Sequence, residues 1–173
     1  GSQIQKRRQS LMIKPLFQNL LVMVNGTEAS INAVEYAVLM AKLYRSKVHA
    51  VYVVDTATIK QLTLNRIFIE EESREYEENL EQNGLRYLAY VDELGKAKGV
   101  KIETELRRGA IWSEIVASAE ERHIDVILLG GSDHDSTDQK EINSSTFKSI
   151  LLNARCSVLT VKERMIEQLY KLA

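Results

Sequence analysis

The stretch VILLGGSDHDSTDQKEINSSTFKSILLNARCSVLTV, residues 126–161, predicts more about the fold than any other part of the chain. It opens with an apolar run, turns at Gly130-Gly131 and continues through an Asp-rich segment, residues 132–143. Ser144-Ser145-Thr146 is typical of a helix start, and Ser157–Val161 indicates a further strand. Because glycines allow close backbone approach and a helix N-terminus favours negative charge, this order predicts an anion site in an α/β protein.

The composition indicates one ordinary globular domain. The chain has 173 residues, 45% hydrophobic and 27% charged, with a net charge of −1. This charge excludes a general attraction to nucleic acid or to an acidic membrane surface. Cys156 is the single cysteine, so no disulfide forms within the chain, which suits a reducing compartment and predicts a cytoplasmic location. No apolar run reaches the roughly 18–20 residues of a membrane helix, so we expect no membrane insertion.

The chain divides into three predicted segments. Residues 1–15 form a basic leader, in which Gly1-Ser2 is typical of a cloning remnant. A mobile terminus or a packed N-terminal arm is favoured over nucleic-acid binding. Residues 16–162 form one domain, and residues 163–173 form a C-terminal tail. The chain does not begin with Met, so a cytosolic regulatory domain of a larger membrane transporter is an alternative hypothesis.

Strand and helix patterns alternate along the domain. Apolar runs indicate strands, and apolar residues at helical spacing indicate amphipathic helices. Before the stretch quoted above, the predicted elements are a strand at Phe17–Val24, a helix capped by Ser30, a strand at Lys47–Val54, a short helix or a loop at Thr56–Phe68, a helix at Glu70–Lys98, a strand at Val100–Arg107 and a helix at Ile111–Glu121. Gly84 falls on the apolar stripe of the long helix and predicts a close approach to the sheet.

This alternation predicts an open, mostly parallel five-stranded sheet with right-handed crossovers and helices on both faces, a Rossmann-like α/β fold. Ligands of such sheets bind at the carboxyl ends of the strands, where the strand order reverses. Those ends are predicted at Asn25-Gly26, Val53–Asp55, Gly109 and Gly130-Gly131.

Five segments, in order, resemble the universal stress protein family. They are LLVMVNGTEAS, VEYAVLMAK, VHAVYVVD, RRGAIWSEIVASAEERHIDVILLGG and CSVLTVK, and together they span most of residues 17–161. The resemblance implies an adenine nucleotide alpha hydrolase-like fold and a cytoplasmic regulatory protein of the stress response. It also implies a homodimer. We expect the strand Ser157–Val161 to be its contact, because pairing removes an exposed sheet edge. Any further protein partner is unknown.

The family's ATP-binding members carry G-x-x-G, nine residues, and then G-S or G-T after the fourth strand. Counting back from Cys156 places these glycines at Gly131, His134 and Ser144, with Ser145 as the hydroxyl residue. Counting forward from Asp125 moves the register by one residue and still loses two of the three glycines. The residues that the resemblance implies for nucleotide contact are Met23, Val24, Asn25, Val53, Gly130, Gly131, His134, Ser144, Ser145 and Thr146.

These departures predict weak nucleotide binding. Side chains at His134 and Ser144 occupy space where the backbone would approach phosphates. A carboxylate about 5 Å from a phosphate charge costs on the order of 1–3 kcal/mol, and Asp133, Asp135 and Asp138 lie near the same place. We therefore expect ATP or AMP to bind weakly or not at all, and magnesium to bind only together with ATP. An ATP-binding protein with slow ATPase activity is a second alternative.

No catalytic or metal-ligating set is predicted. His49, His123 and His134 show no metal-ligand spacing. Cys156 has no sequence partner for nucleophilic chemistry and is interpreted as a buried or interface thiol. The interpretation leans away from an enzyme and towards a binding or regulatory domain.

Overall fold

The computed structural model describes residues 15–131 and 144–173, and in it five parallel strands form one sheet. The strands lie in the order β3-β2-β1-β4-β5. Their bounds are Asn19–Val24 for β1, Lys47–Val54 for β2, Ile102–Arg108 for β3, Val126–Gly130 for β4 and Ser157–Val161 for β5. The prediction of a parallel five-stranded α/β sheet is confirmed.

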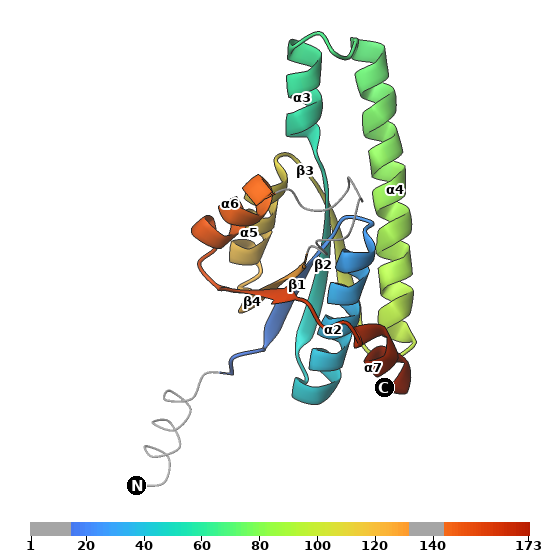
Figure 1. Cartoon of the computed structure of the whole chain (residues 1–173), viewed down its shortest axis with the longest axis vertical. Coiled ribbons are helices and arrows are strands. Elements are labelled where there is room, and N and C mark those ends of the chain that lie inside the picture. Colours follow the sequence, from blue (N-terminus) through green and yellow to red (C-terminus); the bar gives the residue numbers. More distant parts are fainter. Residues whose placement is uncertain (1–14, 132–143) are drawn as a thin grey trace, which may run out of the picture.

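Helices cover both faces of the sheet (Figure 1). One face carries α2, α4 and α7, and the other carries α5 and α6. Their bounds are Glu28–Tyr44 for α2, Thr56–Leu64 for α3, Glu70–Lys96 for α4, Ile111–Glu121 for α5, Ser144–Asn153 for α6 and Ile166–Leu172 for α7. No helix among residues 15–131 and 144–173 is both long enough and apolar enough to cross a membrane.

The side-chain alternation of β1 divides the core into two layers. Leu20, Val22 and Val24 pack on the α2 and α4 side, while Leu21 and Met23 pack on the α5 and α6 side. All five are at most 3% exposed, as expected for a central parallel strand that is buried on both faces. The first apolar run of the sequence is therefore explained by packing on two sides.

The helix start after β1 differs from the prediction. Thr27, not Ser30, is the N-cap of α2, because Thr27 is extended (φ −82°, ψ 155°) and its side chain accepts from the Ser30 amide. Ser30 lies in the first turn of the helix, and its Oγ donates to the Thr27 carbonyl at 2.9 Å. Two neighbouring hydroxyl residues are both plausible caps by sequence, and the extended backbone at Thr27 decides between them.

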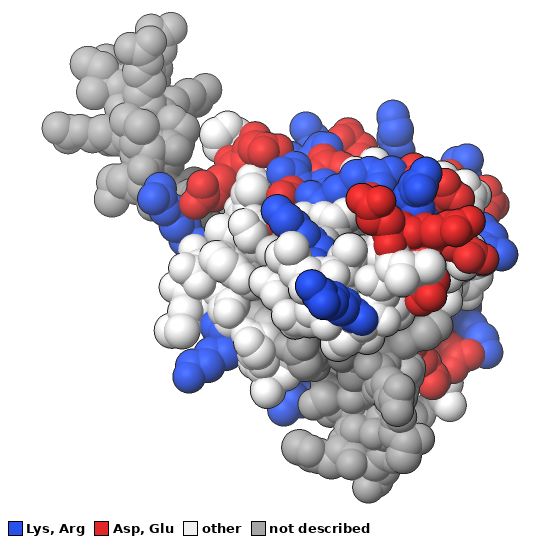
Figure 2. Space-filling model, turned by 90° about the horizontal axis from the view of Figure 1, so that it is seen from above, with Lys and Arg blue, Asp and Glu red and all other residues white. Residues whose placement is uncertain are grey.

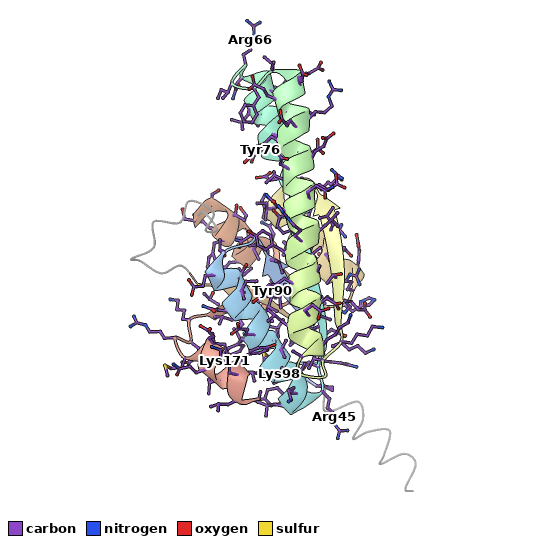
Figure 3. All side chains as sticks on the ribbon, turned by 90° about the vertical axis from the view of Figure 1, so that its right-hand side faces the viewer. Arg45, Arg66, Tyr76, Tyr90, Lys98 and Lys171 are labelled. Atoms are coloured by element: carbon purple, nitrogen blue, oxygen red, sulfur yellow. The ribbon has the colours of Figure 1, made fainter. Side chains whose placement is uncertain are left out.

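Of the two readings of residues 56–68, the structure has the short helix. Asp55 caps α3, with its carboxylate accepting from the Thr58 amide at 3.1 Å and from the Thr58 hydroxyl at 2.7 Å. The five residues between α3 and α4 turn the chain back, so that the two helices form an α3–α4 hairpin. This hairpin extends beyond the sheet at the carboxyl end of β2 (Figures 1 and 3).

The expected close approach of Gly84 to the sheet is confirmed. A Cβ at Gly84 would lie 2.5 Å from Cδ1 of Tyr52 and 2.9 Å from a Leu106 methyl carbon, so only glycine lets α4 pack this close to β2 and β3. The sheet-facing part of α4 is thereby fixed, while its first turns project with α3.

Candidate functional site

The carboxyl ends of β1, β2 and β4 lie at one edge of the sheet, called here the carboxyl edge. Val24, the last residue of β1, pairs with Tyr52 of β2, and Val22 pairs with Leu128 of β4. The structure therefore brings together three of the predicted positions, Asn25, Val53 and Gly130, with Gly131 next to them. The strand order also reverses here, since β1 lies between β2 and β4.

Asn25 organises the turn that follows β1. Its Oδ1 accepts from the Thr27 amide at 3.1 Å and from the Thr27 hydroxyl at 2.6 Å. The Thr27 hydroxyl oxygen in turn accepts from the Ser30 amide at 3.1 Å. Two amides at the start of α2 are thus bonded to side chains of the protein itself, which leaves fewer donors for an anion at this helix end.

Gly130 and Gly131 make close contacts with the protein. A Cβ at Gly130 would lie 2.8 Å from the Ser30 nitrogen and closer still to the Ala29 carbonyl. A Cβ at Gly131 would lie 2.8 Å from the Val161 carbonyl oxygen, and the Gly131 amide donates to that same oxygen at 2.9 Å. The glycine pair is therefore required for β4 to pack against α2 and β5, whether or not a ligand binds.

The other predicted site residues, together with the side chain of Val53, fall into four groups. Met23 and Val24 are 3% and 1% exposed and belong to the core, so their side chains face packed neighbours. Ser144 and Ser145 are exposed in the first turn of α6, followed by the half-buried Thr146. His134 lies outside the described residues. Val53, at 9% exposure, packs on the α5 and α6 side of the sheet.

Tyr87 of α4 contacts the Asn25–Thr27 turn and was not predicted as part of this edge. A Cβ at Gly26 would lie 2.6 Å from Cζ of Tyr87, and Gly26 has φ +79°, a backbone conformation that favours glycine. The Tyr87 ring also stacks on Tyr52 at 6.3 Å between centroids. A tyrosine on the buried stripe of α4 was the available sequence signal, but only the fold shows which turn it meets.

Arg107 of β3 is bound to acidic residues of β3 and α5. Arg107 forms ion pairs with Glu105 at 2.8 Å, Glu114 at 2.8 Å and Glu121 at 2.9 Å. The hydrogen bonds that Arg107 donates to these carboxylates, that to Glu121 first, raise the pKa of Arg107 above its ordinary value. This cluster joins β3 to α5 and is best explained as structural.

No metal-binding group emerges from the part of the chain that the structure describes, where no three His, Cys, Asp or Glu residues are placed to share an ion. Burial lowers the pKa of His49, whose Nδ1 lies 3.4 Å from a Glu103 oxygen. Burial raises the pKa of the Cys156 thiol, which disfavours the reactive thiolate. Cys156 lines a cavity with His123 and Arg155, and this cavity lies at the opposite end of the sheet from the carboxyl edge.

The same fold and segments occur in known proteins. A sequence model described as the universal stress protein family matches residues 16–162. The chain belongs to the universal stress protein family. Universal stress protein MJ0531 of Methanocaldococcus jannaschii is 30% identical over 149 residues, covering 86% of this chain and 84% of that protein.

Solved structures of universal stress proteins share the fold. The protein UspA from Lactobacillus plantarum is 21% identical with a TM-score of 0.69, over 86% of this chain and all of that one. The universal stress protein from Archaeoglobus fulgidus, solved in complex with dAMP, is 15% identical with a TM-score of 0.55, over 86% of this chain and all of that one. At these identities the likeness supports the fold alone.

The universal stress fold places the family's nucleotide motif at the carboxyl edge, where a ligand would have to fit the residues present. At the glycine pair, the Gly131 amide donates to the Val161 carbonyl at 2.9 Å and is not available to a phosphate.

Proposed function

We propose that this universal stress protein is a cytoplasmic, homodimeric binding and regulatory domain that holds an adenine nucleotide weakly or not at all. The observation that supports weak binding is that the Gly131 amide donates to the Val161 carbonyl at 2.9 Å and is not available to a phosphate. Contacts to phosphate oxygens are the usual source of tight nucleotide binding, and here the glycines that would provide them are replaced or occupied.

The remaining affinity comes from the carboxyl edge and from the start of α6. Ser144 and Ser145 are exposed at that helix end, where a helix dipole favours an anion by roughly 0.3–1 kcal/mol. Such a small contribution can stabilise the charge of one bound phosphate better than the charge of three. AMP is therefore expected to bind at least as well as ATP, and magnesium is expected to bind only together with ATP.

Calorimetric titration with AMP, ATP and a cyclic nucleotide, with and without magnesium, tests this proposal. We expect dissociation constants of about 1 mM or weaker, which is a binding free energy of roughly −4 kcal/mol. Saturable micromolar ATP binding would contradict the proposal. Ser144→Gly is the matched variant: a gain in ATP affinity identifies the missing motif glycine as the cause, and Ser149→Gly, later in α6, is its control.

The homodimer is proposed from the exposed edge of β5. Within the described residues β5 pairs with β4 alone, and its first residue, Ser157, is exposed. A parallel edge strand presents unpaired backbone groups, and pairing with a second copy satisfies them. Analytical ultracentrifugation at micromolar concentration tests the dimer, and a purely monomeric species would contradict it.

A further inference from the structure

The α3–α4 hairpin ends in an apolar surface that no other described part of the chain covers. Leu64, Ile67 and Ile69 are 66%, 63% and 61% exposed, and Tyr76 is 45% exposed. Figure 3 shows Arg66 at the end of the hairpin and Tyr76 along α4, both beyond the sheet. Single exposed apolar residues are normal, but four on one small projection mark an interaction surface.

The hairpin holds this surface out by its own internal contacts. Ile59 and Ser73 are 6% and 9% exposed between the two helices, and the hydroxyls of Thr63 and Ser73 are hydrogen-bonded. The rings of Phe68 and Tyr76 lie 5.6 Å apart. Leu64, Ile67 and Ile69 are more exposed than Tyr76, so polar substitutions at these three positions remove little packing from the hairpin.

The same projection is acidic. Residues 60–78, called here the hairpin tip, contain three basic and six acidic residues. Glu70, Glu71 and Glu72 form no ion pair with any other described residue. The helix dipole accounts for acid in the first turn of α4 but not for the exposed Glu75 and Glu78 beyond it. Figure 2, seen from the hairpin end, shows acidic and basic side chains interspersed beside an uncharged surface.

An acidic surface with an apolar centre fits a segment that is both basic and apolar. The chain contains such a segment in residues 3–14 of the basic leader, with the sequence QIQKRRQSLMIK. It has four basic residues, no acidic residue, and four apolar residues at positions 4, 11, 12 and 13. Its charge and its apolar content both complement those of the hairpin tip.

Residues 7–14 of the same chain's leader, which include Arg7, Arg8 and three of its four apolar residues, are too close to the domain to make this contact. The leader enters the domain at the amino end of β1, whereas the hairpin projects beyond the carboxyl edge (Figure 1). The six residues of β1 and the nine of α3 separate these points by roughly 33 Å. Arg8 lies seven residues before Pro15, so even a fully extended chain carries it only about 25 Å.

We propose that the hairpin tip is a docking surface for residues 3–14 of the basic leader of a second copy of this chain. The apolar residues of the leader cover Leu64, Ile67 and Ile69, and Lys6, Arg7 and Arg8 meet the glutamates of α4. This contact is separate from the carboxyl edge and from the β5 edge, so it does not depend on nucleotide binding or on strand pairing.

Sedimentation equilibrium of the full chain carrying Thr160→Pro, which blocks pairing at β5, isolates this contact. Ile67→Ser together with Ile69→Ser should weaken self-association by about tenfold or more, because each loses most of an apolar side chain's burial. Leu172→Ser is the matched control, since Leu172 is 86% exposed on α7, and it should leave self-association unchanged.

A charge exchange identifies the occupant. Glu71→Lys with Glu75→Lys should weaken self-association, as should Arg7→Glu with Arg8→Glu, each by roughly fivefold or more. All four changes together should restore it, which a merely structural effect would not do. A synthetic peptide of residues 3–14 should inhibit self-association of the Thr160→Pro chain in which the hairpin tip and the leader are both unchanged.

Two results would overturn the proposal. If the tip substitutions abolish self-association and the leader substitutions leave it unchanged, the occupant is a second hairpin tip. If the Thr160→Pro chain is monomeric and does not bind the peptide, the tip serves a different protein or none.

Discussion

At the scale of single residues, the sequence and the structure give different reasons for the glycines at 130 and 131. By sequence, Gly130-Gly131 belongs to a nucleotide motif. In the fold, Gly130 faces the Ala29 carbonyl and the Ser30 nitrogen, and Gly131 faces the Val161 carbonyl. Backbone atoms cannot move aside as the end of a flexible side chain can, so these glycines are needed for the sheet to meet its helices.

Gly130→Ala is expected to destabilise the protein by about 1–3 kcal/mol, the usual cost of overpacking a tight contact. The measurement is the midpoint of urea unfolding, followed by circular dichroism. Gly99→Ala is the comparison, because a Cβ there meets nothing within 4 Å and only the φ of +70° opposes it. A smaller loss at Gly130 than at Gly99 would show that the edge relaxes around the new methyl group.

At the scale of elements, β5 is one of the two edge strands of the sheet. The Val161 carbonyl accepts from Gly131 on the β4 side. Because successive residues of a strand direct their backbone groups to opposite sides, the amides of Val158 and Thr160 face away from β4. The sequence predicted this strand correctly, and the topology places it at the edge of the sheet.

Thr160→Pro should abolish the β5-mediated dimer while leaving the β4–β5 pairing intact. Proline removes the outward donor at residue 160, and prolines are tolerated on edge strands. Sedimentation velocity compares this variant with Thr160→Val, which keeps the amide and should remain dimeric. Dimers of equal stability in the two variants would place the dimer contact elsewhere.

At the scale of the whole molecule, the last helix closes the core over a buried acid. Tyr170 of α7 donates its hydroxyl to the Leu94 carbonyl at 2.7 Å, and Lys42 of α2 donates to Ala173 at 3.0 Å. Beneath this closure lies Glu35, 6% exposed, whose Oε2 has no hydrogen-bond partner among the described residues. Burial raises the pKa of Glu35 above 4.5, Glu167 raises it further and Lys171 lowers it.

The stability of the molecule should therefore fall as pH rises. A carboxyl whose pKa is higher in the folded state binds its proton more tightly there. Its contribution to the free energy of unfolding is therefore complete below pH 4.5, and it is lost as the pH rises through the raised pKa. Glu35→Gln should remove the loss, making the variant more stable than the natural chain at pH 8 by about 1.4 kcal/mol for each unit of the raised pKa.

Urea unfolding at pH 4, 6 and 8 measures this difference. The control is Glu93→Gln, because the Glu93 side chain is 73% exposed on α4 and should show no such dependence. A stability difference between Glu35→Gln and the natural chain that is the same at every pH would contradict the assignment to ionisation.

The sequence by itself determined the sheet, because apolar runs such as Val126–Leu129 and helical stripes such as Ile111–Glu121 are local patterns. It also located the carboxyl edge, since strand ends are marked by turn residues such as Asn25-Gly26. Thr27 and Ser30 are both residue types that cap helices, and the extended backbone of Thr27 decided that Thr27 caps α2.

Only the tertiary structure decided what Gly130 touches, where Tyr87 lies, that Glu35 is buried and that the α3–α4 hairpin projects. Each of these depends on contacts between residues far apart in the chain, and a local pattern carries no information about its distant partner. The resemblance to the nucleotide motif is local in the same sense: Gly130-Gly131 remains in the sequence, while the fold shows that the Gly131 amide is bonded to the Val161 carbonyl of β5.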